Sequence, residues 1–160
     1  MDQEAQREHR WLRRLLGRWS YHSQVTVEPG QPPLALGGSE VGRPLGDLWV
    51  LLEGEGEMPD GNRGRWLMTL GYDPRQGCFV GSWTGSMMAH LWLYRGSLDA
   101  SGNVLTLDTE GPAMNGEGRL AHYRDVIEFL ADDRRLLRSE VLGDEGQWHQ
   151  FQVSEFRRAE

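Results

Sequence analysis

Hydrophobic residues recur at two different spacings along this chain, and the spacing changes at Gly17. Before it, apolar side chains recur every three or four residues, which is the spacing of one face of an α-helix. We therefore predict an amphipathic helix over residues 3–16, with Leu15 on its apolar stripe. After Gly17, apolar and polar residues alternate with period two, beginning with Trp19 and Tyr21. This alternation is typical of β-strands that bury one face.

Turn residues divide the rest of the chain into ten segments that are predicted to be strands. They are residues 18–27, 34–43, 47–57, 64–72, 77–84, 90–98, 103–110, 118–130, 134–142 and 147–157. The connections are too short for a crossover helix, so consecutive strands must be antiparallel neighbours. Closure into an up-and-down barrel would remove the exposed edges of such a sheet. The predicted fold is all-β: one domain over residues 1–160, with a helix at 1–16 and a ten-stranded antiparallel barrel at 17–157.

Between the predicted helix and the first strand, Gly17 and Trp19 form a Gly-x-Trp motif. Glycine lets the chain bend tightly into a strand, and the indole would plug the narrow end of a barrel. A short helix, Gly-x-Trp and a run of strands resemble the start of lipocalin-like (calycin) barrels. That resemblance implies an arginine late in the chain that packs over the tryptophan. Arg157 and Arg158 are the candidates for this structural plug.

If the plug marks the closed end, alternate loops of an up-and-down barrel lie at opposite ends. The loops predicted at the open end are residues 28–33, 58–63, 85–89, 111–117 and 143–146. Four of the six methionines fall in them: Met58, Met87, Met88 and Met114. Because methionine is flexible and polarizable, such a rim suits apolar ligands of varied shape. The alternative is that these side chains fill gaps beneath the loops.

Alternation places aromatic side chains on the inner face of the predicted barrel. Those expected to line a pocket below the rim are Trp83, Trp92, Tyr123 and Phe151. An aromatic lining binds planar or lipophilic molecules well. The same rings could instead fill a solid barrel, and the sequence leaves both arrangements open. Segment 90–98 is apolar on both faces, so its inner face is undecided.

Three polar residues are candidates for chemistry in the same pocket. Asp125 lies on a predicted inner face, and His90 and His149 fall at the mouth ends of their strands. His149 alternates with Phe151 and Val153, so all three are predicted to point inward. A carboxyl or imidazole group there suits the general base of an isomerase, cyclase or hydrolase, whereas the alternative for each is a hydrogen-bonded structural role. No two histidines have the spacing of a local metal motif, so no metal site is predicted.

The composition of the chain excludes some classes of binding partner. The chain has 17 basic and 24 acidic residues and a net charge of −7, which argues against nucleic acid or an anionic membrane surface as the partner. The pair Arg134-Arg135 is expected on a solvated face. Cys78 is the only cysteine, so an intramolecular disulfide is excluded. No apolar run approaches the ~20 residues of a membrane span, and residues 1–10 lack the apolar core of a secretory signal. We expect a cytoplasmic protein without membrane insertion, and a homodimer is left open.

Several longer motifs resemble one family. They are residues 47–50 (DLWV), 53–59 (EGEGEMP), 68–74 (MTLGYDP), 79–83 (FVGSW), 85–88 (GSMM), 105–112 (LTLDTEGP), 123–125 (YRD) and 146–149 (GQWH). Together they resemble the bacterial family catalogued as domain of unknown function 1579 over nearly the whole chain. The resemblance implies a calycin-like β-barrel and no established activity.

The predicted architecture also resembles nitrobindins, ten-stranded barrels that hold haem through a histidine near the C-terminus. This resemblance implies His149 as a haem ligand. Where nitrobindins carry a glycine-rich extension after Gly-x-Trp, this chain has residues 20–23 (SYHS). The leading hypothesis is a barrel that binds a small lipophilic or aromatic molecule, with no cofactor. The alternatives are haem or metal binding through His149 and an enzyme that acts through His90, Asp125 or His149.

Overall fold

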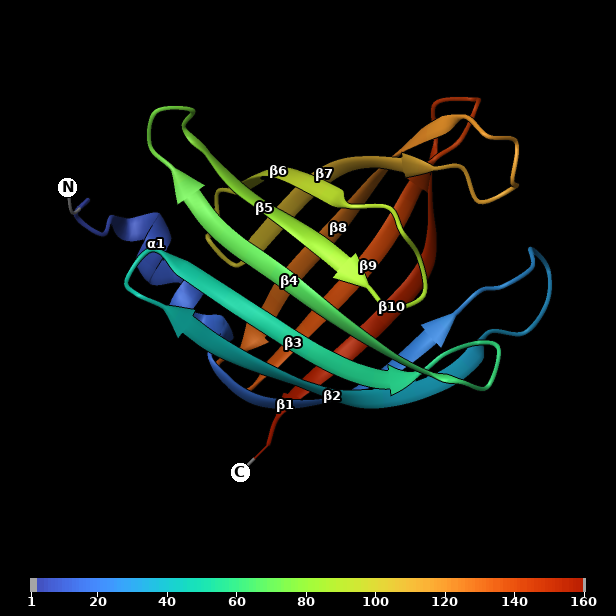
Figure 1. The fold of residues 1–160 in the computed structure, drawn as a ribbon, viewed down its shortest axis with the longest axis horizontal. Helices are drawn as coiled ribbons and strands as arrows, with labels where there is room; N and C mark the ends of the chain where they lie inside the picture. Colours follow the sequence, from blue (N-terminus) through green and yellow to red (C-terminus); the bar gives the residue numbers. More distant parts are fainter. Residues whose placement is uncertain (1–2, 160) are drawn as a thin grey trace.

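The computed structural model describes residues 3–159, which form a closed barrel of ten antiparallel strands with a short helix at one end (Figure 1). The elements are α1 (Arg7–Leu12), the 3-10 turn η1 (Arg13–Leu15), β1 (Gly17–Val25), β2 (Leu34–Leu45), β3 (Trp49–Glu57), β4 (Arg63–Asp73), β5 (Cys78–Gly85), β6 (Trp92–Leu98), β7 (Val104–Pro112), β8 (Leu120–Ala131), β9 (Arg134–Leu142) and β10 (Trp148–Arg158). Consecutive strands are hydrogen-bonded neighbours, and β1 closes the ring by pairing with β10. The predicted up-and-down barrel is confirmed.

The helix is shorter than the predicted 3–16. Gln6 is extended, and its N–H donates to Nδ1 of His9 at 2.9 Å, so the helix starts at Arg7. This cap is missed in the sequence because glutamine and histidine are not the usual capping residues. Nε2 of His9 donates to the carbonyl oxygen of Tyr72 at 2.9 Å, which ties the helix to β4. Within residues 3–159, the structure contains no helix that is long and apolar enough to cross a membrane.

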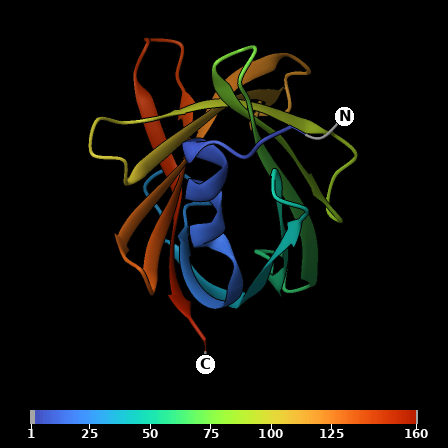
Figure 2. The same cartoon turned by 90° about the vertical axis from the view of Figure 1, so that its left-hand side faces the viewer.

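The helix lies across one end of the barrel, as Figure 2 shows. Nε1 of Trp11 donates to the carbonyl oxygen of Gly102 at 2.6 Å, in the β6–β7 turn at that end. The interior beneath the helix is a solid apolar core. Its fully buried members are Leu12, Leu15, Trp19, Leu52, Leu70, Phe79, Leu105, Leu107 and Ile127. This half of the barrel is therefore closed by packing as well as by the helix.

Gly17 and Trp19 lie at this closed end. Gly17 has a φ of +106°, in the region that favours glycine, and a Cβ there would lie 2.8 Å from Nη1 of Arg158. The ring of Trp19 is buried beneath two guanidinium groups, with Arg158 at 4.2 Å and Arg135 at 4.6 Å from the centroid. Arg157 lies exposed on the outer face. Arg158 is therefore the late arginine that packs over the tryptophan.

Replacing Arg158 with alanine should lower the free energy of unfolding by about 1–2 kcal/mol. Its guanidinium donates to the carbonyl oxygens of Arg14 and Asp132, each at 3.0 Å, and of Leu16. The substitution removes these bonds together with the contact over the indole. Arg157→Ala is the matched control and should change stability by less than about 0.5 kcal/mol. Urea unfolding of both variants measures the difference, and equal losses would show that Arg158 has no special role.

The period-two alternation that begins at Trp19 continues to Val27 in the sequence, so it places Val27, like Val153, on the inner face. Neither residue points inward. Val27 lies beyond the end of β1 and is 55% exposed. In β10, a β-bulge between Gln150 and Gln152 shifts the register against β9. As a result Phe151 and Gln152 both border the interior, and Val153 faces outward. A bulge interrupts alternation, and for that reason the period-two pattern misplaced Val153.

Candidate functional site

The half of the barrel away from α1 is hollow. It contains a cavity of about 530 Å³ that opens among the loops after β3, β5 and β7. Met58, Met87, Met88 and Met114 all border this cavity. The loops that carry them lie at the end opposite α1, on the right of Figure 1. The volume falls within the range of about 300–1,000 Å³ that small-molecule sites occupy.

Aromatic side chains form the wall below this rim. Trp83, Trp92, Tyr123 and Phe151 border the cavity, and the structure places Trp92 there although alternation left the inner face of its segment undecided. The ring of Tyr123 packs edge-to-face against Trp92 at 5.0 Å and against Phe151 at 6.1 Å between centroids. The hydroxyl of Tyr123 donates to the carbonyl oxygen of Pro112 at 2.6 Å, which fixes the middle ring. The structure thus brings these rings together, and their part in binding stays a prediction.

Polar side chains form a continuous band on the inner face of one side of the barrel, here named the polar stripe. From β1 round to β6 its members are Ser23, Ser154, Gln152, Ser139, Asp125 and Tyr94. The hydroxyl oxygens of Ser23 and Ser154 are 2.5 Å apart, and Nε2 of Gln152 donates to Ser154 at 3.2 Å. The strand register then places Gln152 beside Ser139, and Ser139 beside Asp125.

Asp125 accepts two hydrogen bonds within the polar stripe. The hydroxyl of Ser139 donates to Oδ1 at 2.7 Å, and the hydroxyl of Tyr94 donates to Oδ2. Burial raises the pKa of the Asp125 carboxyl, and these two bonds oppose the rise. Burial and the adjacent Asp125 charge raise the pKa of Tyr94 well above its usual value. The Tyr94 hydroxyl therefore remains a donor.

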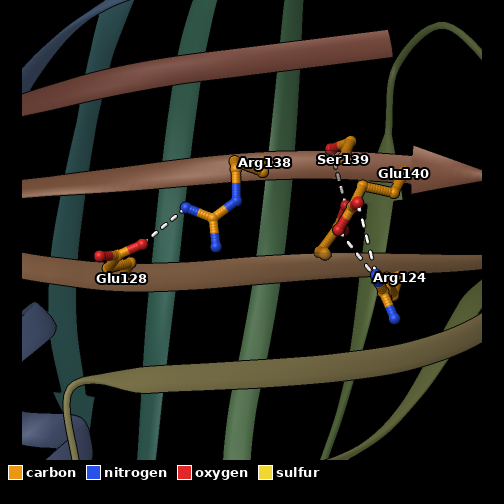
Figure 3. A network of polar contacts seen from close by, with 6 residues as sticks. Arg124, Glu128, Arg138, Ser139 and Glu140 are labelled. Carbon is orange, nitrogen blue, oxygen red and sulfur yellow. Dashed lines mark hydrogen bonds and ion pairs between the residues drawn. The ribbon is translucent and has the colours of Figure 1, made fainter. Parts of the chain in front are cut away.

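No basic side chain among residues 3–159 accompanies Asp125 on the cavity wall. Arg124 and Arg138, on β8 and β9, point to the outer face because successive residues of a strand alternate. There they pair with Glu140 at 3.0 Å and with Glu128 at 2.6 Å (Figure 3). Only hydroxyl groups therefore compensate the buried carboxyl of Asp125, an arrangement that disfavours its ionised form.

A second carboxylate, Glu40, lies at the floor of the cavity and has a counter-charge. Nη2 of Arg135 donates to Oε1 at 2.5 Å, and Nε1 of Trp66 donates to Oε2 at 2.9 Å. Burial lowers the pKa of Arg135, and the charge of Glu40 opposes this. The expectation of a solvated Arg135 is wrong: its guanidinium is 1% exposed between the rings of Trp19 and Phe156, because alternate residues of β9 face inward.

The two candidate histidines lie outside the cavity wall. Nε2 of His90 donates to the carbonyl oxygen of Glu110 at 3.0 Å, and its ring packs edge-to-face on Trp92. His149 is exposed near the end of β10, over Gly143 of the β9–β10 turn. No imidazole among the described residues lines the cavity, so its wall does not fit a haem held by His149. Residues 3–159 also contain no cluster of three or more histidine, cysteine or acidic side chains that could hold a metal ion.

Of the six residues of the polar stripe, only Asp125 is identified from the sequence, and Ser23, Ser139, Ser154, Gln152 and Tyr94 are missed. Tyr94 lies on the segment that is apolar on both faces, where alternation assigns neither side. Gln152 faces inward only because of the bulge in β10. Ser139, by contrast, alternates with Leu137 and Val141, so the period-two pattern already placed it on the inner face.

Fold and cavity together define a closed ten-stranded barrel with one hollow half, which fits a calycin-like fold. The chain belongs to the family described as "Protein of unknown function (DUF1579)", whose family model matches residues 4–158. No curated protein matches it significantly in sequence.

Three solved structures of similar fold are informative. The protein Rv2717c from M. tuberculosis has a TM-score of 0.67 at 14% identity, over 98% of this chain and 100% of its own. The S-type phycobiliprotein lyase CPES from Guillardia theta has a TM-score of 0.62 at 13% identity, over 98% and 99%. The barrel EF1p2_mFAP2b, bound to DFHBI, has a TM-score of 0.50 at 14% identity, over 95% and 99%. At these identities the likeness shows the fold alone.

Proposed function

We propose that this protein binds a small lipophilic or aromatic molecule inside the barrel. The observation that carries the proposal is the cavity of about 530 Å³, open at the methionine rim and bordered by tryptophan, tyrosine and phenylalanine rings. Water in such a cavity leaves apolar surface hydrated, and a ligand that displaces it gains about 25 cal/mol per Å² of apolar surface buried. The helix half of the same barrel is packed solid, so closure of the fold does not itself require a hollow interior.

Two proteins of similar fold support this proposal. The barrel EF1p2_mFAP2b is bound to the small molecule DFHBI, and the Guillardia theta protein is a phycobiliprotein lyase.

The two alternative functions, an enzyme and a haem protein, have less support from the geometry. Of the three candidate bases, Asp125 borders the cavity, whereas His90 and His149 do not. Haemin titration provides a direct check, since a Soret band that is lost in His149→Ala would favour haem over the proposed ligand.

The neutral fluorophore N-phenyl-1-naphthylamine tests the proposal, because its emission rises when it leaves water for an apolar site. We expect a saturable rise at one probe per chain. Leu137 borders the cavity, so Leu137→Trp places an indole inside it and should weaken binding at least about tenfold. Leu93 is 64% exposed on the outer face of β6, and Leu93→Trp should bind as the wild type does.

Thermal unfolding of both variants confirms that they are folded before their affinities are compared. The proposal fails if the wild type gives no saturable rise. It fails equally if Leu137→Trp and Leu93→Trp bind the probe with the same affinity, since the probe would then lie outside the cavity.

A further inference from the structure

We infer that the preferred ligand carries a protonated amine, or an equally strong hydrogen-bond donor, that binds Asp125, and that it carries no carboxylate. This inference rests on the proposed binding function and specifies its ligand class. Three observations support it: the charge on the cavity wall, the free acceptor positions of Asp125 and the position of the polar stripe opposite an apolar wall.

The ionisable groups on the cavity wall are acidic. Glu40, Glu57 and Asp125 border the cavity, together with tyrosines, and no arginine, lysine or histidine among the described residues does. Arg135 compensates Glu40 from behind the wall at 2.5 Å, and Glu57 accepts the N–H of Gly37 at the rim, at 3.2 Å. A carboxylate ligand would therefore meet like charge and find no basic side chain on the cavity wall.

Asp125 has unused acceptor capacity. Each carboxylate oxygen can accept two hydrogen bonds, and within the barrel Oδ1 accepts one from Ser139 and Oδ2 one from Tyr94. Because Asp125 borders the cavity, a ligand donor can occupy a remaining position. A cationic donor would also supply the counter-charge that the wall lacks, and charge-assisted hydrogen bonds are about twice as strong as neutral ones.

The part of the cavity wall across from β9 and β10 is apolar. In the order of the barrel, β4 and β5 lie across from β9 and β10. They contribute Trp66, Met68 and Trp83 to the cavity, facing the polar stripe. A ligand that fits both walls has an aromatic face toward these rings and a polar edge toward Asp125 and Gln152.

Three naphthalenes of nearly equal shape test the inference: 1-naphthylmethylamine, which is a cation at neutral pH, 1-naphthylmethanol and 1-naphthoate. Their affinities are measured by displacement of N-phenyl-1-naphthylamine and by calorimetry. We expect the amine to bind at least about tenfold more tightly than the alcohol, and the naphthoate to bind most weakly. Asp125→Asn should abolish the preference for the amine over the alcohol.

Asp108→Asn is the matched control, because it removes the same charge from an exposed position on the outer face of β7. It should keep the preference for the amine. The preference should also persist at high ionic strength, because salt screens a buried pair less than it screens the net charge of −7.

The outcomes separate the inference from the function on which it rests. If the reporter dye binds but the amine shows no advantage, or if the naphthoate binds best, the inference is wrong and the proposed function stands. An amine preference that survives in Asp125→Asn also overturns it. If neither the dye nor any naphthalene binds, the proposed function fails as well. The ranking on the wild-type protein decides the matter even if Asp125→Asn does not fold.

Discussion

Replacing Arg135 with methionine should lower the free energy of unfolding by about 3–5 kcal/mol. Arg135 and Glu40 pair at 2.5 Å, and their side chains are 1% and 5% exposed. Removing the guanidinium leaves a buried carboxylate whose remaining donor is Nε1 of Trp66. Methionine has a similar length and fills most of the space between Trp19 and Phe156. The decrease in the free energy of unfolding therefore measures the effect of the unpaired charge rather than that of an empty volume. Urea unfolding at neutral pH measures the effect.

Two further variants make this result specific. Arg138→Met lies on the outer face of the same strand and breaks the half-exposed pair with Glu128, so it should cost no more than about 1 kcal/mol. Adding Glu40→Gln to Arg135→Met removes the buried charge while keeping an acceptor for Trp66, and should recover much of the lost stability. If Arg135→Met costs no more than Arg138→Met, the buried pair has no structural importance.

Replacing Asp125 with asparagine should raise stability at neutral pH and change it little in acid. Because burial raises the pKa of this carboxyl, the folded protein keeps the proton at pH values where the unfolded chain has lost it. Wild-type stability therefore falls as the pH rises from the ordinary aspartate pKa of about 4 to the raised pKa, and stays lower above it. Each unit of that rise costs about 1.4 kcal/mol. Asparagine does not ionise, so it carries no such cost.

The quantity to measure is the difference in unfolding free energy between Asp125→Asn and the wild type, from about pH 4 to about pH 8. Taking the difference cancels the other titrating groups, and Asp108→Asn controls for the loss of one negative charge. A difference that is constant with pH would contradict the raised pKa of Asp125. A carboxyl that lowers stability where it borders a cavity is the pattern expected of a binding residue.

The two buried carboxylates, Glu40 and Asp125, have different roles in the two halves of the barrel. Glu40 is neutralised by Arg135, whose guanidinium covers Trp19 of the solid half, so this pair joins the core to the cavity floor. Asp125 lies in the hollow half and has only hydroxyl partners. Loss of the Glu40–Arg135 pair should lower the stability of the fold. Loss of the Asp125 charge should raise that stability and reduce the preference for a cationic ligand.

Much of the architecture could be predicted because its signals are local. Period-two alternation and short connections gave ten antiparallel strands, and antiparallel order sends alternate loops to opposite ends. The methionines at 58, 87, 88 and 114 therefore gather at one mouth although they are distant in sequence. The contact between Glu40 and Arg135 had no such signal, because it joins residues 95 positions apart on strands that are not neighbours.

The sequence by itself determined the strands, their order and the end of the barrel at which the methionine rim lies, since these follow from spacing along the chain. Only the tertiary structure decided that the helix half is solid and the other half hollow. It also decided that Asp125 faces the cavity without a cation, and that His90 and His149 lie outside the wall. A cavity depends on how side chains from all ten strands fill one shared interior, and a single bulge in β10 changes which of them take part.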